Sequence, residues 1–227
     1  MNTELFTGKA AAYAAARPGY PNEAIHYVLN LAPPNAIFAD IGAGTGIFTR
    51  EIAKLGVEIF AVEPNADMLA QLSKLAEEFP NVKIRPHSAE KTMLPDASVD
   101  VIICAQALHW FDPAAFAAEC VRIGKPGATV VAIYNSTPGG SSAAHSKDST
   151  KNFFETPTVR EFPNPIRYTR EKWVTYMTSH SYDPLPSDPN FDKHIAEVNA
   201  IFDKENLGGF LHRKVVTKIY HEKVSRL

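Results

Sequence analysis

A glycine-rich turn between an apolar run and an amphipathic run most constrains the fold of this chain. The turn covers residues 42–46 (GAGTG) and follows the apolar segment 36–41. Apolar residues then recur at helical spacing from Ile47 to Leu55. This order predicts a strand, a tight turn and the first turn of a helix. Because the three glycines carry no side chains, a ligand can approach the backbone N–H groups of the turn closely.

The carboxylate of Asp40, two residues before the first glycine, indicates which ligand the turn favours. A pyrophosphate beside this carboxylate would be repelled, whereas a cationic ligand would be attracted. The glycine spacing is G-x-G-x-G, which differs from the G-x-G-x-x-G of the dinucleotide fingerprint. Both observations favour a cationic ligand over a dinucleotide.

The charge and cysteine content argue against several classes of partner. A formal net charge of −2 over 227 residues gives no electrostatic argument for nucleic acid or an anionic membrane. The chain shows no signal-peptide pattern, and no apolar run approaches the roughly 18 residues that span a bilayer. Cys104 and Cys120 lie in strand-like and helix-like runs, which favours buried thiols, and no metal-ligand spacing is present. We therefore expect a cytoplasmic protein with no metal site, no nucleic-acid partner and no membrane contact.

Strand-like and helix-like segments alternate between residues 36 and 136, which is typical of a parallel sheet with crossover helices. The predicted strands are Ala36–Ile41, Val57–Val62, Val82–Pro86, Val99–Ala105 and Ala128–Tyr134. The predicted helices between them are Thr45–Leu55, Asn65–Phe79 and Asp112–Ile123, with Asn65 and Asp112 as N-caps. The strands are almost continuously apolar, so we expect both faces of the sheet to be covered.

The flanking regions complete a single domain over residues 1–227. A helix is expected over Pro21–Leu31, and further helices over Thr169–Ser179 and Phe191–Lys204. A long last strand over Phe210–Val224, with no crossover after it, is expected to join the sheet antiparallel. We divide the domain into an N-terminal lid and helix (1–35), a core (36–136), a variable cap (137–190) and a final helix and strand (191–227).

Polar residues at the predicted strand ends are candidate ligand contacts. Glu63 ends the second strand, at the edge where doubly wound sheets bind ligands and where a carboxylate can accept bonds from ribose hydroxyls. Met68 either contacts one face of a base ring or fills the core. Glu90 is a candidate to cap the helical turn that follows it. Gln106 and His109 follow the fourth strand, and this position favours a site role for His109.

Four features occur in one order: an N-terminal segment of the form F-x-G-K-A-x-x-Y-x-x-x-R-P (6–18), the glycine turn, Glu63 and the run 105–111. With these features in this order, the chain resembles the class I S-adenosylmethionine-dependent methyltransferases of the type 11 group. The run QALHWF (106–111) is similar to that of trans-aconitate methyltransferase-like members. The resemblance implies an α/β fold, with a Rossmann-like doubly wound sheet of seven strands, an antiparallel last strand and a small helical cap.

The resemblance also implies S-adenosyl-L-methionine as the cofactor. It places Tyr13 and Arg17 over the methionine carboxylate; the alternative is that both merely cover one helix face at i, i+4 spacing. The expected cofactor contacts are Tyr13, Arg17, Asp40, Gly42, Gly44, Gly46, Glu63, Pro64, Met68, Ser88, Ala89, Glu90, Ala105 and Gln106. His109 is the expected general base for an acceptor that must lose a proton.

The activity that these features predict is in-line methyl transfer to a small-molecule acceptor, with a carboxylate as one candidate (EC 2.1.1.-). We expect a monomer or a homodimer. The alternatives are a catalytically silent S-adenosylmethionine-binding protein and a nicotinamide-dependent oxidoreductase. Asp40 and the glycine spacing argue against the oxidoreductase. Four basic residues of the variable half either bind an acidic acceptor or belong to the solvated surface: Arg160, Arg167, Arg170 and Lys172.

Overall fold

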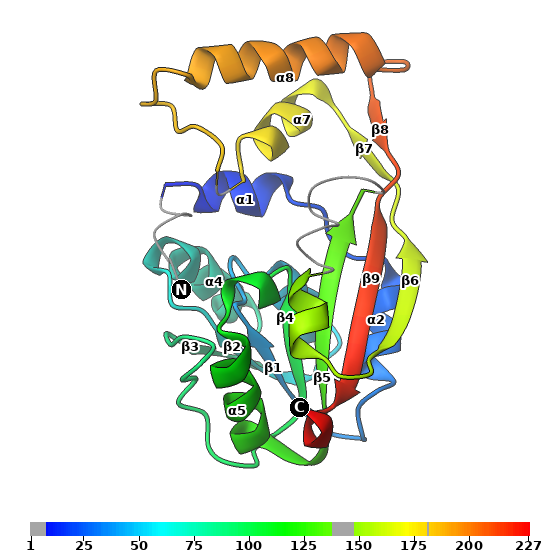
Figure 1. Ribbon diagram of the computed structural model, residues 1–227. Helices are drawn as coiled ribbons and strands as arrows, with labels where there is room; N and C mark the ends of the chain where they lie inside the picture. The colour runs from blue at the N-terminus through cyan, green and yellow to red at the C-terminus, as the bar shows by residue number, and fades with distance from the viewer. Residues whose placement is uncertain (1–7, 138–147, 181) are drawn as a thin grey trace.

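The computed structural model describes residues 8–137, 148–180 and 182–227. Its main sheet has seven strands in the order β3-β2-β1-β4-β5-β9-β6 (Figure 1). Strands β1 to β5 are parallel, β9 pairs antiparallel with β5, and β6 pairs antiparallel with β9. The predicted seven-stranded sheet with an antiparallel last strand is confirmed.

The core elements lie close to their predicted positions. The strands are β1 (Ile37–Ile41), β2 (Glu58–Val62), β3 (Val82–Arg85), β4 (Val99–Ala105) and β5 (Gly124–Ser136). The helices are α2 (Asn22–Leu29), α3 (Ile47–Ala53), α4 (Ala66–Glu78) and α5 (Pro113–Ile123). Asn65 and Asp112 are the N-caps of α4 and α5, where their side chains accept the N–H groups of Met68 and Ala115 at 3.0 and 2.8 Å.

Helices cover the sheet on both faces, as the apolar strands predict. The neighbouring residues Ile102 and Ile103 of β4 are both fully buried but belong to different apolar clusters. This follows from the alternation of side chains along a strand. One cluster includes Phe116 of α5, and the other includes Ile25 of α2 and Leu72 of α4. Each such buried side chain contributes about 1.5–3 kcal/mol.

A cap stands over the carboxyl edge of the parallel strands (Figure 1). It contains β7 (Ile166–Tyr168), α7 (Arg170–Met177), α8 (Phe191–Glu205) and β8 (Leu211–Arg213), and β7 pairs antiparallel with β8. Trp173 of α7 packs with Val198 and Phe202 of α8, and its Nε1–H donates to the Val198 carbonyl at 3.0 Å. The helix α8 therefore packs with the cap, although the sequence grouped it with the last strand.

The single strand predicted over Phe210–Val224 is wrong. The structure divides this segment into β8 and β9 (Val216–Lys223), which lie in different sheets. A tight turn separates the two strands, because the Val215 N–H donates back to the Arg213 carbonyl at 3.1 Å. The sequence also missed α1 (Ala10–Ala16), which lies between cap and sheet, and β6 (Thr158–Pro163) at the sheet edge (Figure 1).

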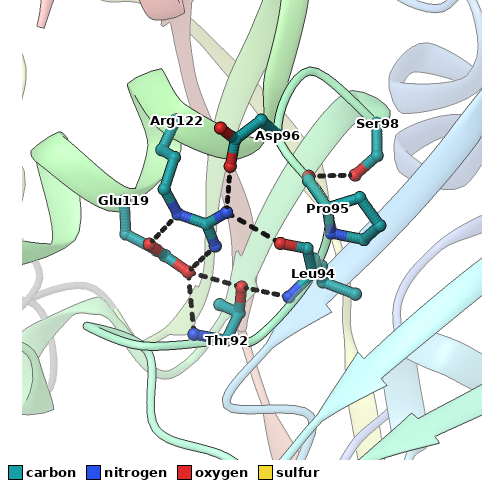
Figure 2. A network of polar contacts seen from close by, with 7 residues as sticks. All are labelled: Thr92, Leu94, Pro95, Asp96, Ser98, Glu119 and Arg122. Atoms are coloured by element: carbon teal, nitrogen blue, oxygen red, sulfur yellow. Dashed lines mark hydrogen bonds and ion pairs between the residues drawn. The ribbon is translucent and has the colours of Figure 1, made fainter.

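A partly buried network of ion pairs fastens the loop after β3 to α5 (Figure 2). The Glu119 carboxylate accepts the N–H and Oγ1–H of Thr92 at 2.8 and 2.6 Å, and Nε–H of Arg122 at 2.8 Å. Arg122 also pairs with Asp96 at 2.5 Å. Burial acts to raise the pKa of Glu119, but the hydrogen bonds from Arg122 and Thr92 outweigh it and lower that pKa. The network fixes a loop that contains no regular helix.

Cys104 and Cys120 are both buried thiols, which confirms the prediction made for them. Among the helices that the structure describes, none combines the length and apolarity that crossing a bilayer requires.

Candidate functional site

A cavity of about 330 Å³ lies between the carboxyl edge of the sheet and the cap. The turn after β1 and the ends of the strands contribute its inner wall, which includes Gly42, Gly44, Glu63, Met68, Ala105 and Gln106. The segment from α1 onward contributes Tyr13, Arg17, Pro18 and Tyr20. The cap contributes Tyr176, Met177, His180 and Tyr182. Eight of the predicted cofactor contacts therefore meet at one cavity.

The three glycines of the turn differ in what an added side chain would contact. All three have positive φ angles, of +71° at Gly42, +57° at Gly44 and +84° at Gly46. A Cβ at Gly42 would lie 2.7 Å from the Ala107 Cβ, and one at Gly46 would lie 2.6 Å from the Leu75 Cδ2. A Cβ at Gly44 would meet no atom within 4 Å. Gly42 and Gly46 thus allow close packing, whereas Gly44 leaves open space beside the cavity.

The Glu63 carboxylate holds the turn from the end of β2. Its side chain is buried, with Oε2 accepting the Gly44 N–H and Oε1 accepting the Asn65 N–H, each at 2.8 Å. Burial raises the pKa of Glu63, and the two backbone hydrogen bonds partly offset this rise. Each carboxylate oxygen can still accept one further hydrogen bond from a ligand.

Asp40 lies behind the turn and does not line the cavity. It is 1% exposed, and its Oδ2 accepts the Thr49 Oγ1–H at 2.6 Å. Its Oδ1 is buried and has no hydrogen-bonding partner among the described residues. Burial raises the pKa of Asp40 to about 7, with the charge of Glu63 adding to the rise and the Thr49 hydrogen bond opposing it. The expected attraction for a cationic ligand would therefore act through the turn.

Arg17 is the one permanently charged cation among the described residues that line the cavity. Its guanidinium lies over the rings of Tyr13 and Tyr176, at 4.7 and 5.4 Å from their centroids. Its Nη2–H donates to the Ser179 carbonyl at a long 3.4 Å, and its Nε–H is buried without a partner in the described part of the chain. An unpaired buried donor of this kind costs about 1–3 kcal/mol, so the site is suited to an anionic ligand group.

Gln106 holds an unusual backbone conformation at the end of β4. Its φ is +59°, which non-glycine residues rarely adopt. Its Nε2–H donates to the Asn135 carbonyl at 3.2 Å. The Asn135 side chain in turn donates to the Gly19 carbonyl at 3.0 Å and accepts the Thr217 Oγ1–H at 2.5 Å. These bonds join the N-terminal segment to β5 and β9 at the cavity wall.

The structure does not bring the remaining predicted residues to the cavity wall: Asp40, Gly46, Pro64, Ser88, Ala89, Glu90 and His109. Ala89 packs in the core, and Glu90 accepts the Asp112 N–H at 3.2 Å near the start of α5. His109 is exposed on a short 3₁₀ turn, η2 (Leu108–Trp110), and its ring lies against Trp110 at 4.8 Å between centroids. Their roles toward a ligand stay predictions.

The basic residues of the variable half also lie elsewhere. Arg160, Arg167, Arg170 and Lys172 do not line the cavity. The Arg167 guanidinium lies 4.0 Å from the centroid of Phe210, and Arg170 pairs with Asp203 on α8. Within the described ranges no group of three or more His, Cys, Asp and Glu side chains is placed to hold a metal ion.

Sequence reasoning predicted a cap over residues 137–190 but did not identify the cap residues that line the cavity. Tyr176, Met177, His180 and Tyr182 come from α7 and the loop after it. The available signal was the density of aromatic and imidazole side chains in residues 176–182 (YMTSHSY). Nothing in the sequence shows which side chains of the cap face the cavity, because that depends on how the cap packs.

Comparisons with known proteins find methyltransferase domains similar to this chain. A methyltransferase-domain family model matches residues 39–132. An uncharacterized methyltransferase of Mycobacterium bovis is 36% identical over 130 residues, which are 57% of this chain and 51% of that protein. The chain spans about half the length of the curated relatives it matches.

Two solved structures share the fold. One is provisionally described as a type II methyltransferase of Anaeromyxobacter dehalogenans, with a TM-score of 0.64 and 23% identity over 92% of this chain and 98% of that one. The other is the [4+2]-cyclase SpnF, with a TM-score of 0.62 and 13% identity over 97% of this chain and 93% of that one. The family model and the relatives identify residues 39–132 as similar to a methyltransferase domain, and the strand order with its antiparallel last strand is the one that the resemblance to class I S-adenosylmethionine-dependent methyltransferases implies.

Proposed function

We propose that this protein binds S-adenosylmethionine in the cavity and catalyses transfer of its methyl group to a small-molecule acceptor. The supporting observation is that the open Gly44 backbone, the Glu63 carboxylate and the Arg17 guanidinium line the same cavity. These groups complement the sugar hydroxyls and the carboxylate of this ligand. The bound sulfonium supplies an activated methyl group together with a thioether leaving group.

The residues of the chain bind and orient the reactants. Glu63 accepts hydrogen bonds from ribose hydroxyls, and each charge-assisted bond contributes about 1.5–3 kcal/mol. Arg17 donates to the methionine carboxylate, and the rings of Tyr13 and Tyr176 exclude water beside it. Alignment of the reacting atoms accounts for about 7–11 kcal/mol of barrier reduction in well-oriented reactions.

Whether the cavity suits an anionic acceptor depends on which group Arg17 binds. A carboxylate acceptor needs no base, but it does need a cation near it. If Arg17 binds the methionine carboxylate, no second permanent cation among the described lining residues remains for the acceptor. The trans-aconitate-like subgroup, the cytoplasmic location and the monomeric or dimeric state stay predictions.

Titration calorimetry with S-adenosylhomocysteine and with NAD tests the proposed cofactor. We expect saturable binding of S-adenosylhomocysteine and none of NAD. Glu63→Gln keeps the size of the side chain but loses its charge, so affinity should fall by about 10–100-fold. Glu58→Ala is the matched control, because Glu58 lies at the other end of β2 and pairs with Lys83 at the surface. Exclusive binding of NAD would overturn the proposal.

A catalytically silent binding protein is the second candidate, since a cyclase of the same fold shows that this fold also occurs in proteins that are not named methyltransferases. Transfer of a labelled methyl group to a panel of small metabolites separates the two candidates. Tight cofactor binding without transfer to any acceptor would favour the silent protein.

A further inference from the structure

His180 lies in a tight turn directly after α7 and lines the cavity. Its side chain is 15% exposed. Its ring stacks on Tyr182 at 5.4 Å and meets the edge of Tyr176 at 4.9 Å between centroids. It is the one histidine among the described residues that line the cavity.

Asp183 fixes the orientation of the His180 ring. The buried Asp183 Oδ2 accepts the backbone N–H of His180 at 2.7 Å and lies 2.8 Å from its Nδ1. Because an ionised carboxylate can only accept, Nδ1 carries the proton of the neutral ring and Nε2 carries the lone pair. In the described part of the chain no hydrogen bond reaches Nε2. This is the relation between a base and its orienting carboxylate.

Lys9, the residue directly before α1, anchors the same turn. It is 5% exposed, and its Nζ donates to the carbonyls of His180 and Asp183 at 2.7 and 2.5 Å. Two segments far apart in the chain therefore hold the His180 turn in place. Such support is what a positioned catalytic side chain needs.

Burial and the nearby positive charges lower the pKa of the His180 imidazole, which favours its neutral form. Burial is the largest cause that lowers the pKa of His180, and the positive charges of Arg17 and Lys9 lower it further, while Asp183 opposes them. Tyr176 and Tyr182, the other titratable groups against the ring, are phenols. A neutral ring with its lone pair on Nε2 is the form that accepts a proton.

We propose that His180 is the general base of the reaction and that the acceptor is a phenol. This rests on the proposed function. The aromatic rings around the cavity match a planar aromatic acceptor, and the His180–Asp183 pair matches an acceptor that must lose a proton. A carboxylate acceptor has no proton to lose, so its methylation would not need the His180–Asp183 pair.

The step is balanced without any further reagent. His180 Nε2 takes the phenolic proton and becomes part of an imidazolium, which Asp183 stabilises. An electron pair of the phenol oxygen forms the new O–C bond to the methyl carbon. The C–S bond breaks with its electron pair going to sulfur, so the positive charge passes from the sulfonium to His180. The imidazolium then releases its proton to solvent.

The test compares three acceptors in the wild-type protein and in His180→Asn. The asparagine amide can still donate to Asp183, but it has no basic nitrogen. Phenol needs a base, whereas ionised 4-nitrophenol and benzoate do not. We expect turnover of phenol to fall by about 10²–10⁴-fold in the variant. Turnover of the two ionised acceptors should stay within about threefold, as should affinity for S-adenosylhomocysteine. His212→Asn, at an exposed position of β8, is the matched control.

Asp183 is a positioning residue and gives a second comparison. Asp183→Asn should lower phenol turnover and move the rise of that turnover with pH to lower pH, because the neutral amide no longer favours the imidazolium and the pKa of His180 falls further. If His180→Asn lost turnover equally with all three acceptors, or lost none with phenol, the proposal would be overturned.

Nitrogen-15 NMR of the His180 ring decides the matter if none of the three acceptors is methylated. The proposal requires the Nδ1–H tautomer at pH 7 and a change at Nε2 when phenol is added with S-adenosylhomocysteine. An Nε2–H tautomer, an imidazolium at pH 7 or an unchanged Nε2 would each refute it. Absence of S-adenosylhomocysteine binding would instead refute the proposed function, and the tautomer of His180 would still be readable.

Discussion

At the scale of single residues, Asp40 shows how a carboxylate can be buried beside a ligand site at a cost in stability. Only Thr49 donates to it among the described side chains, and its Oδ1 has no partner there. Its pKa rises from 3.8 to about 7, so the folded protein holds the proton more tightly than the unfolded chain does. The stabilisation from protonated Asp40 is therefore full below pH about 4 and is lost as the pH rises through about 7.

Asp40→Asn should remove this pH dependence, because the amide resembles the protonated acid and does not ionise. We expect the variant to be more stable than the wild type at pH 8, by up to about 4 kcal/mol, and the difference to shrink at pH 5. Urea unfolding at both pH values measures it. Asp192→Asn, at an exposed position of α8, is the control. A stability difference for Asp40→Asn that is the same at pH 5 and pH 8 would contradict the expectation.

At the scale of elements, the glycines of the turn between β1 and α3 serve two purposes: Gly46 allows close packing, and Gly44 leaves room for a ligand. A Cβ at Gly46 would lie 2.6 Å from the Leu75 Cδ2 and 2.8 Å from the Leu72 Cδ1, and both leucines are fully buried. Gly44 has open space instead. The two positions should therefore respond differently to one added methyl group.

Gly46→Ala should lose about 1–3 kcal/mol from overpacking in addition to the strain of its positive φ. Gly44→Ala should lose about 1 kcal/mol from strain alone, while its affinity for S-adenosylhomocysteine should fall tenfold or more. Urea unfolding and calorimetry on both variants separate the two effects. If Gly46→Ala proves as stable as Gly44→Ala, the packing explanation fails.

At the scale of the whole molecule, the cavity joins units that are far apart in the chain. Its walls come from the turn after β1, from α1 and from the cap loop after α7. The Lys9 bonds to the cap and the Asn135 bonds to the N-terminal segment connect these units. A ligand in the cavity should therefore stabilise the cap together with the core.

S-adenosylhomocysteine at 100 times its Kd should stabilise the fold by about 2.7 kcal/mol. For a chain of 227 residues this corresponds to a rise in Tm of about 5–10 °C. Hydrogen exchange should slow both in the glycine turn and in α7. Protection confined to the glycine turn would show that the cap does not respond to the ligand.

Local sequence patterns predict the core elements of this protein and one side of its candidate site. The strands and helices between residues 36 and 136 follow from local periodicity, and Asn65 and Asp112 cap helices because such side chains accept exposed N–H groups at helix starts. Gly44 and Glu63 meet because parallel strands end at one edge of the sheet.

The other side of the candidate site depends on long-range packing. Whether His109 or His180 reaches the cavity depends on the packing of η2 and of the cap, and the sequence contains no local rule for either. The division of the last predicted strand into β8 and β9 likewise depends on the cap, because β8 finds its partner in β7 rather than in the main sheet. Local spacing fixes which residues share a face, but long-range packing fixes what that face meets.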